Sequence, residues 1–172
     1  MSRPAITDKA TPCAMVQIVY GAGGRVVETP VAGLSEFAPK FSRTILIIED
    51  NTSDSDRCRA VLHELGYDGI QLITTLQQAT EYLDDVLNQL TRPPHAIILD
   101  LGLGYDSGFA LLRKRHAHPQ LQQVPILVWS KSAESHTEAL STRLGAKDFL
   151  IKSADKETLR TSLKKLLDQE AT

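Results

Sequence analysis

The hydrophobic and polar residues from Thr44 onward follow two alternating patterns. Short aliphatic runs, such as 44–48 and 97–99, are typical of parallel strands buried on both faces. Between them, apolar residues recur every three or four positions, which is typical of amphipathic helices. The strand-like runs are 44–48, 70–73, 97–99, 124–129 and 147–151, and the helix-like stretches are 53–65, 75–90, 107–116, 134–144 and the segment with Leu159, Leu163, Leu166 and Leu167.

Five strand-like runs, each followed by a helix-like stretch, predict a parallel sheet with helices on both faces. We therefore expect residues 44–170 to form a doubly wound α/β domain with the strand order 2-1-3-4-5. Thr75 and Gln78 form a capping pair that opens the second helix. The apolar face of that helix is expected to extend from Ala79 as far as Leu90.

Residues 1–43 have a different character and are expected to form an N-terminal extension with a flexible start. Two β-prone runs, 15–20 and 25–29, flank a glycine-rich loop and predict a β-hairpin over 15–29. An isolated two-stranded hairpin is only marginally stable in water. We therefore expect it to pack either on an edge of its own domain or on a second copy, which would give a homodimer.

The composition excludes some classes of function but does not identify one. The chain has 172 residues, of which 42% are hydrophobic, and a net charge of -2, so no basic surface for nucleic acid is expected. It has no apolar run of the roughly 20 residues that span a membrane, and no secretory signal is evident, so the cytoplasm is the expected compartment. Cys13 and Cys58 match neither a zinc spacing nor a disulfide framework.

Polar residues stand at the carboxyl ends of four of the predicted strands. Glu49 and Asp50 end the first strand, Asp100 the third, Ser130 the fourth and Lys152 the fifth. In the expected strand order these ends are neighbours, about 4.8 Å apart, at one edge of the sheet. Each residue alone could be a solvated strand end, a helix cap or a surface charge. Together they indicate one site.

The residue types at this edge suit phosphoryl transfer. Three carboxylates favour a hard divalent cation such as Mg²⁺. A lysine and a hydroxyl beside the cation would neutralise and hydrogen-bond the oxygens of a phosphoryl group. One carboxylate could then act as the nucleophile and form an acyl phosphate.

Residues 44 to about 170 resemble the receiver domain of bacterial two-component response regulators, which has a flavodoxin-like fold. The resemblance lies in the acidic pair Glu49-Asp50, the run 97–108 around Asp100, the run 128–130 that ends in Ser130, and the run 148–152 that ends in Lys152. Segments 90–94 and 118–126 also resemble the stand-alone regulators that serve phytochrome-type kinases.

The resemblance implies that Asp100 accepts a phosphoryl group from a histidine kinase or a phosphotransfer protein. Asp50, Asp100 and the backbone carbonyl of Gly102 would coordinate Mg²⁺, with Glu49 acting mainly through water. The only catalysis implied is that of the domain's own phosphorylation and dephosphorylation, so the chain is not expected to be an enzyme with an external product.

Two further roles follow from the resemblance. Ser130 and Lys152 would hold the phosphoryl oxygens. Phe149 stands where the family carries an aromatic switch residue coupled to movement of Ser130, although it could equally belong to the core. Because the chain ends after the fifth helix, output is expected through the surface of the fourth helix, fifth strand and fifth helix to a downstream protein.

The sequence departs from the family pattern at three positions. Gly104 stands where proline is usual, Lys131 follows Ser130 where a small residue is usual, and Ser153 replaces the proline that commonly follows the lysine. Lys131 could crowd the phosphoryl site or add positive charge to it, and it is expected to modulate the rate of phosphorylation. None of these departures removes a reacting group.

Two other functions remain open from the sequence. The chain could be a phosphorylation-independent receiver-like scaffold or dimerisation module that binds through the N-terminal hairpin. A hydrolase with an aspartyl nucleophile is the third alternative, but no second acid is placed to protonate a leaving group. The intact set of strand-end residues favours the phosphorylated switch.

Overall fold

The computed structural model describes residues 16–20, 26–30, 44–104, 106–131 and 134–168. Contacts divide the chain into two units, Met1–Pro39 and Lys40–Thr172. In the first unit, β1 (Val16–Tyr20) and β2 (Val26–Pro30) pair antiparallel as the expected hairpin. The expected flexible start and Cys13 lie outside the described residues.

The second unit is built on a five-stranded parallel sheet in the order β4-β3-β5-β8-β9. Counted along the chain within this sheet, the order is 2-1-3-4-5, so the predicted doubly wound topology is confirmed. The strands are β3 (Ile45–Ile48), β4 (Ile70–Ile73), β5 (Ala96–Leu99), β8 (Ile126–Ser130) and β9 (Asp148–Ile151).

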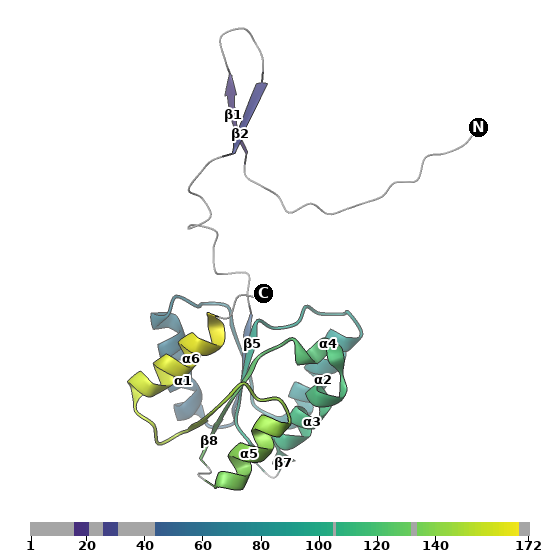
Figure 1. Ribbon diagram of the computed structural model, residues 1–172, viewed down its shortest axis with the longest axis vertical. Helices are drawn as coiled ribbons and strands as arrows, with labels where there is room; N and C mark the ends of the chain where they lie inside the picture. The colour runs from purple at the N-terminus through teal and green to yellow at the C-terminus, as the bar shows by residue number, and fades with distance from the viewer. Residues whose placement is uncertain (1–15, 21–25, 31–43, 105, 132–133, 169–172) are drawn as a thin grey trace, which may run out of the picture. The chain divides into compact units, whose positions relative to one another are not determined.

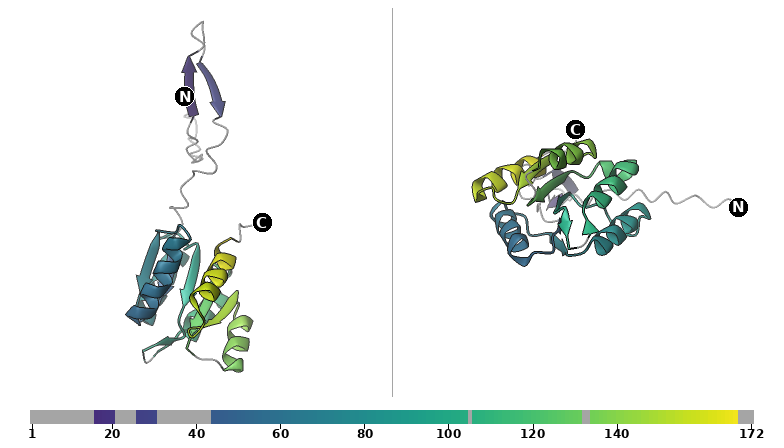
Figure 2. Two further views of the ribbon diagram at one scale, coloured as in Figure 1. Left: turned by 90° about the vertical axis from the view of Figure 1, so that its left-hand side faces the viewer. Right: turned by 90° about the horizontal axis from the view of Figure 1, so that it is seen from below.

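Helices cover both faces of this sheet (Figures 1 and 2). Ile45 and Ile47 of β3 pack into one buried cluster with α1 and α6, while Leu46 and Ile48 pack into a second cluster with α2 and α3. Alternate residues of a strand thus feed two cores, which explains why the strands read as continuous aliphatic runs. The helices are α1 (Thr52–Glu64), α2 (Leu76–Leu87), α3 (Phe109–Ala117), α4 (Pro119–Gln122), α5 (Ser135–Arg143) and α6 (Lys156–Leu167).

Local capping fixes where the helices near the sheet begin. The Asn51 side chain accepts a hydrogen bond of 3.0 Å from the Asp54 N–H, so α1 starts immediately after the acidic pair. Thr75 caps α2 by accepting from the Gln78 N–H at 3.2 Å, as the sequence predicts. The N-cap of α1 sets the direction in which its first turn projects over the carboxyl edge of the sheet.

The prediction that Leu90 lies on the apolar face of the second helix is wrong. The helix ends at Leu87, Gln89 adopts a positive φ of 60°, and Leu90 is 75% exposed. The left-handed residue turns the chain away, so Leu90 fits the periodic pattern although it lies three residues beyond the end of the helix.

Three short elements have no counterpart in the sequence prediction. They are β6 (Gly102–Leu103), β7 (Asp106–Ser107), which pairs with β6, and α4. Elements of two to four residues are too short to show a hydrophobic period. In the described part of the chain, no helix is long and apolar enough to cross a bilayer.

Candidate functional site: an acidic cluster held by a buried lysine

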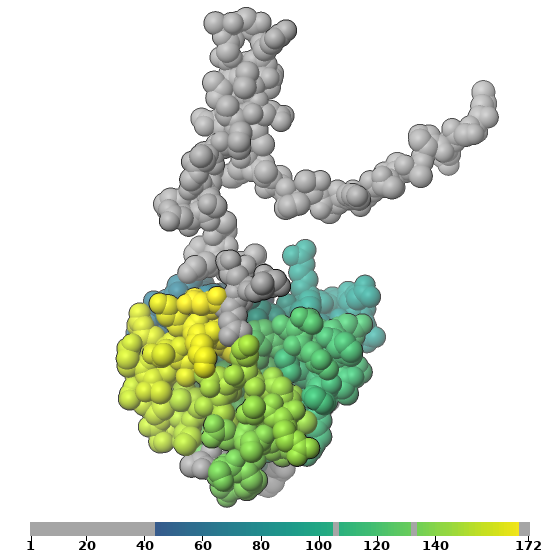
Figure 3. All heavy atoms as spheres, viewed as in Figure 1, coloured from purple at the N-terminus to yellow at the C-terminus, as the bar shows by residue number. Residues whose placement is uncertain are grey.

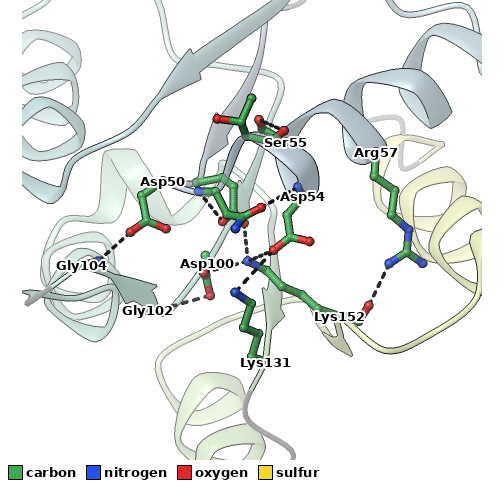
Figure 4. Close-up of polar contacts among 12 residues, drawn as sticks. Asp50, Asp54, Ser55, Arg57, Asp100, Gly102, Gly104, Lys131 and Lys152 are labelled. Atoms are coloured by element: carbon green, nitrogen blue, oxygen red, sulfur yellow. Dashed lines mark hydrogen bonds and ion pairs between the residues drawn. The ribbon is translucent and has the colours of Figure 1, made fainter.

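The sheet places the predicted site residues at one edge. Hydrogen bonds continue past the strands, from the Asp100 N–H to the Ile48 carbonyl and from the Lys152 N–H to the Ser130 carbonyl, each at 2.9 Å. Because the ladder fixes these backbones, the side chains that follow β3, β5 and β9 are directed to the same place. Figure 4 shows Lys152 reaching Asp100 at this edge, with the Asp50 carboxylate beside them turned to Gly104.

The Lys152 ammonium lies at the centre of the site. It contacts Glu49 Oε2 at 2.5 Å, Asp100 Oδ2 at 2.8 Å and Asp54 Oδ2 at 3.0 Å, and its side chain is only 4% exposed. Burial by itself lowers the pKa of Lys152, but the hydrogen bonds to Asp100, Glu49 and Asp54 outweigh burial, so that the pKa is raised overall. The amine is therefore a permanent cation at neutral pH.

Three carboxylates beside this lysine form a set that could hold a cation. One oxygen of each of Glu49, Asp50 and Asp100 lies within 4.8 Å of the others. Burial raises the pKa of Glu49, and the hydrogen bonds from Lys152 and from the Asn51 N–H offset only part of that effect. A hard divalent cation would relieve this cost, because it prefers clustered carboxylate oxygens. The residues therefore fit a Mg²⁺ or Mn²⁺ ion.

A pocket of about 310 Å³ opens next to the Asp100 carboxylate. Asp100, Ser130 and Lys131 all line it. Asp100 is 5% exposed and Ser130 is 4% exposed, so both are buried where the pocket meets the sheet. A tetrahedral anion entering this pocket would meet the carboxylate, the hydroxyl and the Lys131 side chain together.

Comparison with known proteins identifies the family. The sequence profile of the response regulator receiver domain matches residues 45–164. The chain belongs to this family. The response regulator Rcp1 of Synechocystis sp. is 30% identical over 125 residues, which make up 68% of this chain and 81% of Rcp1. The match to the cyclic-nucleotide phosphodiesterase regA of Dictyostelium discoideum, 25% identical over 138 residues, spans 78% of this chain but only 17% of regA.

Solved structures of other receiver proteins share the fold. The crystal structure of Mn²⁺-bound Rcp1 superposes with a TM-score of 0.66 at 21% identity, over 75% of this chain and 97% of that chain. The phosphorylated cyanobacterial phytochrome response regulator RcpA gives a TM-score of 0.63 at 23% identity, over 76% of this chain and 96% of that chain. Receiver domains are signalling modules, and they bind Mg²⁺ or Mn²⁺ at an acidic pocket.

The departures from the receiver pattern have visible consequences in this structure. The Gly104 N–H donates a hydrogen bond of 2.8 Å to Asp50 Oδ2, a bond that proline could not make. Gly104 also adopts a positive φ of 61°. No peptide bond of the described residues is cis, so the bond between Lys152 and Ser153 is trans. The glycine thus orients one of the carboxylates of the acidic cluster.

Phe149 does not line the pocket of Asp100 and Ser130. It lies in β9 opposite Val128, is half-buried, and packs against the cluster of α2 and α3. A core role accounts for this packing. Its role as a switch stays a prediction.

Sequence reasoning missed two residues of α1 that contact the site. Asp54 pairs with Lys152, and Arg57 donates to the backbone carbonyls of Lys152, at 2.8 Å, and Ala154 (Figure 4). Helical spacing could not have pointed to Asp54, because Asp50 precedes the extended N-cap Asn51 and lies outside α1.

Gly108 positions the loop that carries Asp100. Its N–H donates to the Leu101 carbonyl at 2.9 Å, and a Cβ there would lie 2.5 Å from the Asp100 carbonyl oxygen. Gly108→Ala is therefore expected to lower the free energy of unfolding by about 1–3 kcal/mol, as overpacking does, and to slow phosphorylation by displacing the Asp100 backbone. Urea unfolding and labelling with acetyl phosphate measure the two effects.

Gly102→Ala is the matched control in the same loop. Its added Cβ would meet Asp100 Oδ2 at 3.9 Å, an ordinary contact, and the backbone carbonyl is retained. We expect a change in stability within about 0.5 kcal/mol. Equal stability losses in the two variants would contradict the steric role of Gly108.

Proposed function

We propose that this receiver domain is a single-domain response regulator of a phosphorelay, which accepts a phosphoryl group on Asp100 and thereby switches its protein interactions. The phosphodonor would be a histidine kinase or a phosphotransfer protein. The observation that carries the proposal is the buried Lys152 ammonium, which bonds Asp100 beside the acidic cluster.

The proposed step follows from the chemistry of these side chains. A carboxylate oxygen of Asp100 attacks phosphorus, the bond from phosphorus to the donor breaks, and its electron pair leaves with the donor atom. Lys152 neutralises charge on the phosphoryl oxygens, and the Ser130 hydroxyl donates a hydrogen bond to them. The domain thus catalyses its own phosphorylation, and by the same groups its dephosphorylation by water.

Mg²⁺ would be held by Asp50, Asp100 and the backbone carbonyl of Gly102, with Glu49 acting through water, and when bound it neutralises the incoming phosphoryl charge. Around it, the residues of this chain have defined tasks. The Gly104 N–H orients Asp50, and the Gly102 N–H bonds Asp100 Oδ1 at 3.1 Å. Together these bonds leave few orientations open to the two carboxylates.

The output proposed is a contact with a downstream protein, in the cytoplasm, through the surface of α5, β9 and α6. Both helices contact β9, and Figure 3 shows α5 in green and α6 in yellow on the side turned to the viewer. Ser130 and Phe149 lie in β8 and β9, the strands that join the pocket to this surface. Movement of Ser130 towards a phosphoryl group is the proposed signal, with Phe149 as the responding side chain.

Trp129 offers a test of cation binding that separates the switch from a phosphorylation-independent scaffold or dimerisation module. It is the only tryptophan of the chain, and its ring centroid lies 5.5 Å from Lys152 Nζ. A cation that draws Glu49 and Asp100 towards itself must shift the lysine against the indole. Titration with MgCl₂ is therefore expected to give one saturable change in tryptophan fluorescence.

Asp50→Asn is expected to weaken that transition strongly, because it removes one of the anionic ligands. Asp85→Asn, an exposed position on α2, is the control and should titrate like the parent. A parent protein whose fluorescence does not respond to Mg²⁺ would favour the scaffold, and sedimentation with and without residues 1–43 would then test a homodimer.

A further inference from the structure

Lys131 stands at the mouth of the pocket with its ammonium near α1. It lines the pocket together with Asp100 and Ser130. Its side chain is 70% exposed, and its Nζ lies 3.9 Å from Asp54 Oδ2. In Figure 4 the Lys131 side chain extends towards Asp54 and Lys152. A flexible cation is thus close to the place where a phosphoryl group would sit, and is paired loosely with a carboxylate outside the pocket.

Asp54 is held firmly on its side of this contact. It lies in the first turn of α1, where the Asn51 side chain accepts from its N–H, and its side chain is only 19% exposed. One turn later, Arg57 donates to the carbonyls of Lys152 and Ala154 and ties α1 to the loop after β9. Asp54 is outside the acidic set of Glu49, Asp50 and Asp100, and its Oδ2 faces the ammonium groups of Lys131 and Lys152.

The two lysines depend on Asp54 to different degrees. Lys152 also contacts Glu49 at 2.5 Å and Asp100 at 2.8 Å, so Asp54 is one of three carboxylates around it. For Lys131, within the described part of the chain, Asp54 is the only carboxylate within 4.0 Å of the ammonium. Asp54 is therefore in a position to restrain Lys131, and it contributes a third, longer contact to Lys152.

We propose that Lys131 is a second cation for the phosphoryl group and that Asp54 is a positioning residue that restrains it in the unphosphorylated protein. The inference rests on the proposed function. A phosphoryl group carries more negative charge than one carboxylate, and on Asp100 it would enter the pocket that Lys131 lines. Its entry therefore draws the ammonium from Asp54 by exchange of ion pairs, without any covalent change. The restraint lowers the rate at which an anionic donor is used.

The test is labelling of the full chain with acetyl phosphate and Mg²⁺. Asp54→Asn keeps the size of the side chain and removes its charge, so labelling is expected to be about two- to fivefold faster, the range of a partly exposed ion pair. Asp56→Asn, an exposed position on the same helix, makes the same chemical change and should label at the parental rate. Lys131→Gln should label more slowly than the parent.

The double variant isolates the pair. If Asp54 acts through Lys131, adding Asp54→Asn to Lys131→Gln should no longer accelerate labelling. Beryllium fluoride with Mg²⁺, read by Trp129 fluorescence, gives a second measurement that does not depend on turnover. In Asp54→Asn its half-saturating concentration should fall by a similar factor.

The outcomes separate this inference from the proposed function. Parental or slower labelling of Asp54→Asn would overturn the restraint, and so would an acceleration that persists in full in the Lys131→Gln background. If the parent itself takes no label on Asp100, the proposed function fails instead.

Discussion

Replacing Asp100 by asparagine is expected to abolish labelling by acetyl phosphate and Mg²⁺. The amide keeps the shape of the side chain but cannot attack phosphorus to form an acyl phosphate. Glu49 is nearby, yet it is 2% exposed and bonded to Lys152 at 2.5 Å, so it does not face the pocket that Asp100 lines. Intact-mass spectrometry after incubation with the donor measures the loss directly.

Asp85→Asn is the control for this experiment, because it removes the same charge from an exposed position on α2. It should take label like the parent, and circular dichroism should show both variants folded. Retention of label by Asp100→Asn would place the phosphoryl group on another residue and would refute the proposed function.

Replacing Lys152 by methionine is expected to have two large effects. Labelling should fall by about 10²- to 10³-fold, the cost of removing one preorganised charged donor from a reacting site. The free energy of unfolding should fall by about 3–5 kcal/mol, because Glu49 and Asp100 are left as buried charges without their cation. The measurements are labelling rates and urea unfolding at neutral pH.

Mg²⁺ is expected to act differently on this variant than on the parent. Without the competing ammonium, the carboxylates should bind the cation more tightly, so that Mg²⁺ restores part of the lost stability. Phosphorylation should not recover with it. This combination distinguishes loss of the lysine from general unfolding, since an unfolded protein would regain neither.

The free energy of unfolding of the parent is also expected to depend on pH, and the direction of the change can be measured. The pKa of Lys152 in the folded protein is raised above the ordinary value of 10.5. Its stabilisation of the parent is therefore fully present below pH 10.5 and is lost as the pH rises through the folded pKa. This alkaline loss should be absent from Lys152→Met.

Lys156→Met is the matched control, with the same substitution in an exposed ion pair. Lys156 Nζ lies 2.6 Å from Glu64 Oε1, and its side chain is 59% exposed. Such a surface pair is worth about 0–1 kcal/mol, so neither stability nor labelling should change greatly. Equal losses in the two lysine variants would contradict a special role for Lys152.

The sequence by itself determined the sheet and the residues at its edge. The aliphatic runs specify strands that pack on both faces, and a parallel sheet brings successive strand ends together, so Asp100 and Lys152 were expected to meet. The structure places them 2.8 Å apart, at the edge of the sheet that local pattern and strand order predict.

Only the tertiary structure decided which further groups reach the site. Asp54 contacts Lys152 because the Asn51 cap sets the rotation of α1, and Gly104 bonds Asp50 because the loop folds back over the edge of the sheet. Leu90, conversely, leaves its helix at a left-handed residue. These contacts depend on the rotation of a helix about its axis and on the path of a loop, and they join residues distant in sequence. The spacing of hydrophobic residues along the chain specifies neither the rotation nor the path.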